Sequence, residues 1–215
     1  MSAQRLDLAL VARGLCESRT LAQRFILAGQ VWVDGQLADK PSVKVAPGAR
    51  IEVTALPRYV GRGGEKLEAA LRAFGLDPGG KVCLDVGAST GGFTDCLLQH
   101  GAARVYAVDV GRHQLHPKLR ADPRVVVLEG LNARALCAEH VPEPVALATA
   151  DVSFISLEKV LPAVVPLLAP GAEAVVLVKP QFEAGRRRVG RGGVVRDPAV
   201  HAEVLDRVAR FARDE

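Results

Sequence analysis

The sequence predicts an α/β protein, in which a parallel sheet is covered by helices on both faces, with a small α+β module in front of it. Three observations support this prediction. From residue 65 onward, apolar strand-like segments alternate with helical ones, as they do in parallel sheets. A glycine-rich turn at 85–95 follows the first of these strands. The first quarter of the chain instead shows two helical segments followed by short strands.

The amino-terminal module is expected to consist of two helices and then short strands. Apolar residues recur at three-to-four spacing within residues 5–28. Gly14 favours the end of a helix within this segment and Ser18 favours the start of the next one, so two short helices are predicted. Short strands are then expected at 31–33 and 49–53, around hairpin turns.

The larger domain is expected to begin after a linker. Residues 57–64 are rich in glycine and arginine and separate a module at 1–56 from a domain at 65–215, which opens with a helix at 65–74. Strands with helices between them are predicted near 81–86, 104–109, 124–128, 145–150 and 173–178. Ligands in such sheets bind at the carboxyl ends of the strands.

The composition is that of a soluble globular protein, with 49% hydrophobic and 24% charged residues among 215. The net charge of +4 arises entirely from residues 1–66, which hold ten Lys or Arg against six Asp or Glu. Residues 67–215 hold eighteen of each. A basic module beside a neutral domain favours an anionic macromolecule as partner, and a solvated basic face is the alternative. Trp32, the only tryptophan, is expected in the core rather than as a base-stacking platform.

Several classes of protein are disfavoured. The four cysteines show neither C-x-x-C pairs nor metal-ligand spacing, so reduced thiols are expected. Arg5 and Asp7 interrupt the start before an apolar signal-peptide core can form, which favours the cytoplasm. The apolar segment 160–178 contains three prolines and is expected to form a helix ending near Leu168, a Pro-Gly turn and a buried strand, rather than a membrane span.

The glycine-rich turn, DVGASTGGFTD at 85–95, is typical of a nucleotide-cofactor site. Asp109, 22 residues after Gly87, closes the second predicted strand, where an acidic side chain accepts ribose hydroxyls. The spacing is G-x-x-x-G-G rather than the G-x-G-x-x-G that binds a pyrophosphate. A nucleoside without phosphate is therefore predicted, and S-adenosylmethionine is the common cofactor of that kind. A tight turn without ligand is the alternative.

Three polar residues are candidates for chemistry. Asp151 and Lys179 follow two apolar strands, and Lys66 lies on the helix before the first strand. Ammonium groups can stabilise an alkoxide that develops from a hydroxyl, and a carboxylate can orient a lysine. Lys66 taken alone could also be a solvated helix charge.

The amino-terminal module resembles the RNA-binding domain first described in a ribosomal small-subunit protein, the S-four type. The resemblance covers roughly residues 4–56 and rests on Arg5-x-Asp7, Ser18-Arg19, Ile26-x-x-Gly29 and the turn Val-x-Val-Asp-Gly. It implies RNA binding through Arg5, Arg13, Arg19 and Arg24. Arginine suits this role because its planar guanidinium group can donate hydrogen bonds to two phosphate oxygens at once.

The whole chain resembles the TlyA-type ribosomal RNA 2′-O-methyltransferases, whose catalytic domain is Rossmann-like and of the FtsJ type. The motifs RYVGRGGEKL, DVGASTGGFTD, EGLNAR, ADVSFISL, VKPQFE and GRGGVVRDP follow one another in the family's order. The resemblance implies methylation of a cytidine 2′-hydroxyl in ribosomal RNA by S-adenosylmethionine, with no catalytic metal because the sulfonium already activates its methyl group. It places the catalytic set on Lys66, Asp151 and Lys179. It places the cofactor site on Asp85, Gly87, Ala88, Ser89, Thr90, Gly91, Gly92, Phe93, Asp109 and Asn132.

Further arginines are expected to contact RNA. Arg58 and Arg62 lie in the linker, and Arg186, Arg187 and Arg188 lie in a glycine-rich segment without acidic residues, 184–196, which is expected to close over the RNA backbone. A merely solvated loop is the alternative for this segment.

The sequence departs from the family at one position. The family has a fourth, acidic catalytic residue after its last helix, whereas this sequence stops at Glu215 within a predicted helix that starts at Pro198, so a fragment or a shortened protein is expected. A non-catalytic RNA-binding or ribosome-assembly protein, a haemolysin-like protein and an NAD-dependent oxidoreductase are the competing hypotheses. The sequence carries no signal for the oligomeric state, the modified cytidine or the ribosomal subunit.

Overall fold

The computed structural model describes residues 3–54 and 58–214. The chain divides into two compact units, Met1–Pro57 and Arg58–Glu215. The expected boundary between residues 56 and 57 and the terminal Glu215 lie outside the described residues. Residues 58–64, expected as a linker, belong to the second unit.

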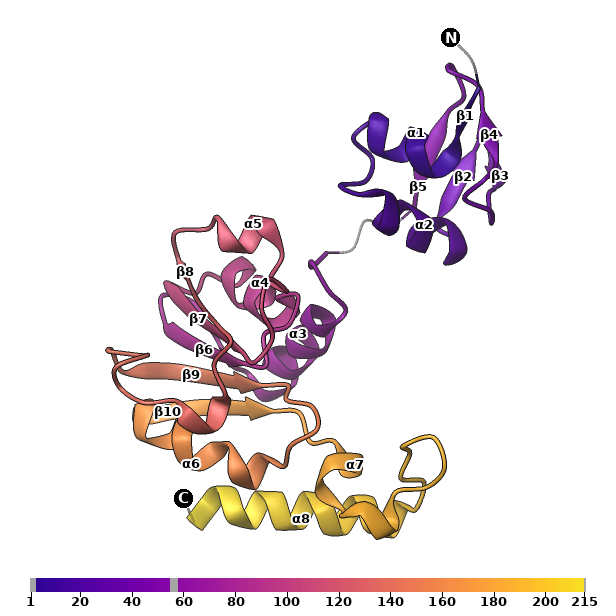
Figure 1. Ribbon diagram of the computed structural model, residues 1–215. Helices are drawn as coiled ribbons and strands as arrows, with labels where there is room; N and C mark the ends of the chain where they lie inside the picture. The colour runs from indigo at the N-terminus through magenta and orange to yellow at the C-terminus, as the bar shows by residue number, and fades with distance from the viewer. Residues whose placement is uncertain (1–2, 55–57, 215) are drawn as a thin grey trace. The chain divides into compact units, whose positions relative to one another are not determined.

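The first unit has the two predicted helices and a small set of strands (Figure 1). Its elements are β1 Gln4–Arg5, α1 Leu6–Ala12, α2 Arg19–Leu27, β2 Val31–Val33, β3 Gln36–Leu37, β4 Lys44–Val45 and β5 Ile51–Val53. The strands form two antiparallel sheets, of order β3-β2-β5 and β1-β4. Ser18 caps α2 by accepting a hydrogen bond from the Leu21 amide at 3.3 Å, which confirms it as a helix start.

Trp32 does not lie in the core, contrary to the prediction. Its neighbour Val31 is fully buried, whereas Trp32 is 37% exposed. Successive side chains of a strand point to opposite faces, so burying Val31 turns Trp32 outward. Its cross-strand partners are Leu37 and Glu52.

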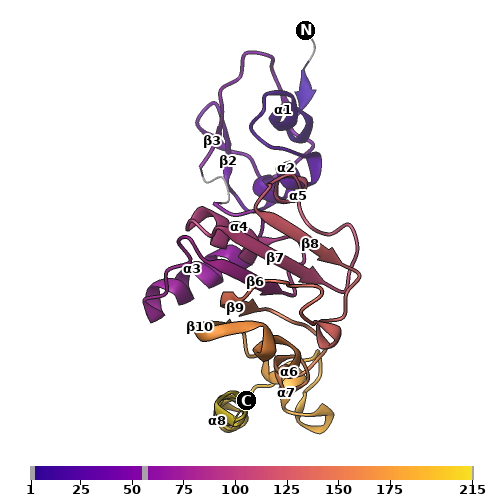
Figure 2. The ribbon, with the colours of Figure 1, turned by 90° about the vertical axis from the view of Figure 1, so that its left-hand side faces the viewer.

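The second unit contains the predicted parallel sheet. Its helices and strands are α3 Gly63–Phe74, β6 Val82–Val86, α4 Gly92–Gln99, β7 Arg104–Asp109, α5 Pro117–Arg120, β8 Val125–Glu129, β9 Val145–Ala150, α6 Leu161–Val164, β10 Leu168–Val176, α7 Pro180–Glu183 and α8 Pro198–Asp214. Its short 3-10 turns are η1 Ala133–Ala135, η2 Leu157–Lys159, η3 Val165–Leu167 and η4 Arg186–Arg188. The strand order is β10-β9-β6-β7-β8, and each neighbouring pair is parallel (Figure 2).

The sheet has an apolar core on each face, as the alternation of strands and helices predicts. Cys83 of β6 packs in one core with Leu67 of α3 and Leu97 of α4. Leu84, the next residue of β6, packs in the other core with residues of α6 and α8 such as Val208. This alternation fixes the register of the central strand, because a shift by one residue would exchange its two faces.

The last strand differs from the prediction. β10 begins at Leu168 and is interrupted before Glu173, where Pro170 lacks an amide donor and Gly171 adopts a φ of 76°. The Pro-Gly turn therefore lies within the strand rather than before it. The strand is half-buried at the sheet edge, not buried, and it ends at Val176.

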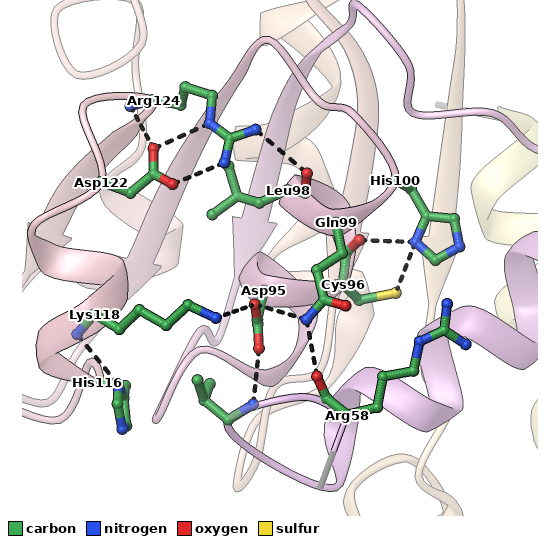
Figure 3. A network of polar contacts seen from close by, with 11 residues as sticks. Arg58, Asp95, Cys96, Leu98, Gln99, His100, His116, Lys118, Asp122 and Arg124 are labelled. Atoms are coloured by element: carbon green, nitrogen blue, oxygen red, sulfur yellow. Dashed lines mark hydrogen bonds and ion pairs between the residues drawn. The ribbon is translucent and has the colours of Figure 1, made fainter. Parts of the chain in front are cut away.

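Residues 58–60 are fastened to α4, the helix that follows the glycine-rich turn (Figure 3). Asp95 is 2% exposed and accepts a hydrogen bond from the Val60 amide at 2.8 Å. The Gln99 side chain donates both to Asp95, at 3.1 Å, and to the Arg58 carbonyl, at 2.9 Å. Lys118 lies 3.8 Å from the same carboxylate. The start of the unit is thus held directly against the helix that carries the end of the turn.

Among the described residues, no helix combines the length and the apolar character that crossing a bilayer requires. The segment 160–178 forms short helical turns and the edge strand instead.

Candidate active site

The candidate site lies where the strand order reverses. β6 and β9 are neighbours, and the chain leaves β6 toward β7 on one side and leaves β9 toward β10 on the other, so the loops at their carboxyl ends diverge and open a crevice there. Gly87 follows β6 and Asp151 follows β9. Gly87 has a φ of 87°, and a Cβ at this position would lie 2.7 Å from the Asp151 carbonyl oxygen. Only glycine allows the two chain segments to approach this closely.

A cavity of about 420 Å³ opens beside this crossing, and we call it the glycine-loop cavity. Its walls include four predicted cofactor residues, Gly87, Ser89, Asp109 and Asn132, together with the predicted catalytic Asp151. The Asp109 carboxylate accepts hydrogen bonds from the amides of Ser89 and Gly111, each at 2.7 Å. These bonds fix both carboxylate oxygens at the cavity wall and leave further lone pairs for a ligand.

The other predicted cofactor residues differ in position. Asp85 is fully buried and accepts hydrogen bonds from the hydroxyls of Thr94, at 2.7 Å, and Thr149, at 3.2 Å. Burial raises the pKa of Asp85 to about 6. The Asp85 side chain therefore joins the turn to α4 and β9 and does not line the glycine-loop cavity, and its expected part in the cofactor site stays a prediction. Ala88, Gly91, Gly92 and Phe93 are buried with it, and Thr90 is exposed outside the cavity wall.

The three predicted catalytic residues come together. The Lys179 ammonium lies 2.6 Å from Asp151 Oδ1 and donates to the Ser153 hydroxyl at 2.8 Å. The Lys66 ammonium lies 3.8 Å from Asp151 Oδ2. Lys66 comes from α3, Asp151 from the end of β9, and Lys179 from the position just before α7 rather than from the end of a strand. The carboxylate thus lies between two ammonium groups beside the cavity.

Glu129 organises the wall of the glycine-loop cavity and was not predicted. Its carboxylate accepts hydrogen bonds from the amides of His113, Gln114 and Leu115, at 2.8–3.1 Å, and from Arg120 at 2.8 Å. The Arg120 guanidinium and these amides lower the pKa of Glu129 to about 2. Gln114 lines the cavity. The available signal was the position of Glu129 directly after the third predicted strand, 124–128.

A second cavity, of about 880 Å³, adjoins the first through Phe154 and Ile155, and we call it the basic cavity. Its lining carries three cationic side chains, Arg134, Lys159 and Arg186. Phe154 is 91% exposed and its ring lies 5.1 Å from that of Phe182, between centroids. Arg134 lies in the EGLNAR motif and Phe154 in the ADVSFISL motif. Their place in these motifs was a signal in the sequence, but their residue types alone did not indicate a function.

Of the four arginines predicted to bind RNA in the first unit, three have two different sets of partners, and the fourth, Arg24, is exposed. Arg5 and Arg19 bind the buried carboxylate of Asp7, at 3.0 and 2.9 Å, and remain partly exposed. These guanidinium groups and Gln23 hold the pKa of Asp7 well below its usual range. Arg13 instead donates to the carbonyls of residues 46, 47 and 49. Its guanidinium is occupied in bracing the module.

The remaining predicted RNA contacts lie in the second unit. Arg58 pairs with Glu68, and Arg62 is exposed. All three residues of η4 are exposed. Within η4, Arg186 lines the basic cavity and Arg188 pairs with Glu203 on α8.

Comparison with known families agrees with this geometry. The sequence profile of the FtsJ-like methyltransferases matches residues 59–215, and that of the S4 domain matches residues 4–51. The chain therefore belongs to the FtsJ-like methyltransferase family, and it is an enzyme of the methyltransferase class. Within that family it is of the TlyA type, with an S4 domain ahead of the catalytic domain.

Individual relatives extend over nearly the whole chain. The 16S/23S rRNA (cytidine-2′-O)-methyltransferase TlyA of Mycobacterium tuberculosis is 50% identical over 98% of this chain and 79% of its own length. YqxC of Bacillus subtilis, provisionally named an rRNA methyltransferase, is 51% identical over 99% of this chain and 76% of its own length. A solved structure from Streptococcus thermophilus with a provisional hemolysin name is 45% identical, covers 100% of this chain and 79% of that one, and has a TM-score of 0.74.

Proposed function

We propose that this protein transfers the methyl group of S-adenosylmethionine to the 2′-hydroxyl of a cytidine in ribosomal RNA. The observation that carries the proposal is the position of Asp151, which lines the glycine-loop cavity and binds the Lys179 ammonium at 2.6 Å. An ion pair of a carboxylate and an ammonium group, which can take part in acid–base chemistry, therefore lies beside a cavity of the size of a nucleoside. The name of the M. tuberculosis relative supports cytidine and ribosomal RNA as the substrate. A ribosomal substrate implies action in the cytoplasm, which stays a prediction.

The cavity residues fit S-adenosylmethionine. Asp109, held by two amides, presents a carboxylate of the kind that accepts the two hydroxyls of a ribose. Gly87 lets the Asp151 backbone approach at the edge of the cavity, and Asn132 adds an amide side chain to the lining. The side-chain oxygen of Asn132 accepts from the Arg134 amide at 3.1 Å, which leaves the side-chain NH₂ group to donate to a ligand. When bound, the cofactor supplies an electrophilic methyl group.

The chain's own residues align and activate the hydroxyl. Most of the rate enhancement of a methyl transfer comes from holding the attacking oxygen in line behind the methyl carbon. Lys179 can donate a hydrogen bond to that oxygen as it gains negative charge, while Asp151 keeps the ammonium oriented. The 2′-oxygen would take the methyl group that bound S-adenosylmethionine supplies with loss of its bond to sulfur, and the hydroxyl proton would leave to solvent, which reaches the site at Lys66, whose side chain is 55% exposed.

The basic cavity provides the RNA side of the site. Its cationic side chains, Arg134, Lys159 and Arg186, suit phosphates, and the exposed ring of Phe154 offers an apolar surface for an unstacked base. Arg5 and Arg19 of the first unit present preoriented guanidinium groups for further phosphates. Both surfaces support RNA as the substrate.

Two measurements test the proposal. Calorimetry should show binding of S-adenosylmethionine and none of NAD. Tritiated methyl transfer to ribosomal subunits that lack the modification should then label RNA, and the labelled nucleotide should resist alkaline cleavage on its 3′ side because its 2′-oxygen is blocked. Absence of S-adenosylmethionine binding would refute the proposal. Binding without transfer would favour the non-catalytic RNA-binding protein, and a Lys179→Ala variant is the matched control for background labelling.

A further inference from the structure

We propose that Glu183 is a positioning residue, which sets the placement of Lys179 against Asp151 by joining the two loops that carry these side chains. This inference rests on the proposed function for its effect on turnover, but its geometric part does not. Glu183 is the last residue of α7, and its side chain is 2% exposed. A carboxylate so deeply buried is costly unless it is fully bonded.

The Glu183 carboxylate is bonded across to the loop after β9. Its Oε2 accepts a hydrogen bond from the Ser156 hydroxyl at 2.6 Å, and its Oε1 accepts one from the Leu157 amide at 2.8 Å. Ser156 and Leu157 lie directly downstream of Asp151 and Ser153, the two groups that Lys179 contacts. Two strong hydrogen bonds therefore fasten the far end of α7 to the loop that holds the partners of Lys179.

Arg207 of α8 completes this connection. Its guanidinium donates to the Glu183 carbonyl at 2.6 Å and lies 3.7 Å from the carboxylate, while its Nε lies 2.9 Å from Glu158. Arg207 thus neutralises the buried charge and ties both loops to one long helix. A helix of four residues such as α7 has almost no stability by itself, so these contacts decide where it lies.

The position of Lys179 depends on these contacts of α7. It is the residue immediately before α7, and its carbonyl accepts from the Phe182 amide at 2.9 Å. Loss of the Glu183 bonds would let α7 move relative to Asp151, and small displacements of a catalytic group cost large factors in rate. The glycine-loop cavity does not include Glu183, so cofactor affinity should not change.

The experiment compares Glu183→Gln and Ser156→Ala with Asp206→Asn, an exposed carboxylate on α8 next to Arg207 that serves as matched control. Ser156→Ala removes one of the two bonds and guards against a Glu183 variant that does not fold. Competitive acetylation of lysines, read by mass spectrometry as the ratio of Lys179 to Lys66, reports the position of Lys179 without any turnover. We expect this ratio to rise about threefold or more in both test variants and to stay constant in the control.

Turnover provides the second readout. We expect kcat to fall about tenfold in Ser156→Ala and further in Glu183→Gln, with the dissociation constant of S-adenosylmethionine unchanged, and the two changes to be non-additive in the double variant. A wild-type labelling ratio in both variants, or equal losses of kcat and cofactor affinity, would overturn the inference. Failure of the wild-type protein to methylate RNA would instead overturn the proposed function and leave the labelling result to decide on Glu183.

Discussion

The Lys179 ammonium lies 2.6 Å from one oxygen of Asp151, whereas the Lys66 ammonium lies 3.8 Å from the other. The two lysines are therefore not equivalent. Lys179 also donates to Ser153, and its side chain is 19% exposed, while Lys66 reaches Asp151 from a solvent-facing position on α3. Preorganised donors act most strongly where water is excluded, so Lys179 should contribute more to transition-state stabilisation.

This asymmetry predicts unequal losses of activity. Lys179→Ala should lower kcat by about 100-fold or more and Lys66→Ala by about tenfold, both with nearly unchanged affinity for S-adenosylmethionine. Tritiated methyl transfer and calorimetry measure the two quantities. Lys81→Ala, at the opposite end of β6 and paired with Glu173, is the control and should keep wild-type kcat. Equal losses of kcat for Lys66→Ala and Lys179→Ala would contradict the asymmetry.

The substitution Glu129→Gln should weaken cofactor binding indirectly, through the residues that the Glu129 side chain holds in place. The change removes the negative charge that holds three backbone amides and Arg120, and it turns an NH₂ group toward those donors. Losing hydrogen bonds to a charged group costs about 1–3 kcal/mol, so the dissociation constant of S-adenosylmethionine should rise about tenfold. Calorimetry measures it, with Glu52→Gln in the first unit as control. An unchanged dissociation constant would show that cofactor binding does not depend on the hydrogen bonds that hold the backbone of residues 113–115.

Two arginines of the first unit should respond in opposite ways. Arg19→Ala should weaken RNA binding for all sequences and reduce the magnitude of its logarithmic salt slope by about one, because a phosphate contact is lost. Arg13→Ala should leave that slope unchanged but lower the free energy of unfolding by about 1–3 kcal/mol, since three carbonyls lose their charged donor. Filter binding over a salt series and denaturant unfolding separate the two effects. A reduced slope for Arg13→Ala would assign it to RNA instead.

Asp85 should make stability fall as the pH rises. Burial raises its pKa from 3.8 to about 6, so the folded protein binds this proton more tightly than the unfolded chain. The stabilisation from Asp85 is therefore complete below about pH 4 and is lost as the pH rises through about 6, an effect on the order of 3 kcal/mol. The free energy of unfolding is measured for the wild type and for Asp85→Asn at pH 4.5 and 7.5. The wild-type value minus the variant value should be smaller at pH 7.5 than at pH 4.5. A constant difference would show that Asp85 titrates at its ordinary pKa.

Local patterns predicted strands β2 and β5 to β9, most helices and the glycine-rich turn correctly, because these depend on the spacing of apolar residues and on glycine conformations that the chain specifies nearby. The alternation in 82–86 predicted a strand with two buried faces, and Ser18 predicted a helix start. Trp32 and the Pro-Gly interruption in β10 differ from what these local patterns predict. Both depend on which face or edge of a sheet the tertiary structure covers.

The sequence by itself determined the class of the protein and indicated the candidates for its cofactor turn and its catalytic set, since these belong to motifs whose order and spacing are local. Only the tertiary structure decided how each of them is used. It placed Asp85 under the turn rather than in the cavity, and it occupied Arg13 with backbone carbonyls. It also revealed Glu129 and Glu183 as organisers of their loops. A charged side chain takes its role from the partners that the fold brings within hydrogen-bonding distance, and residues 27 positions apart, such as Ser156 and Glu183, meet only in the folded chain.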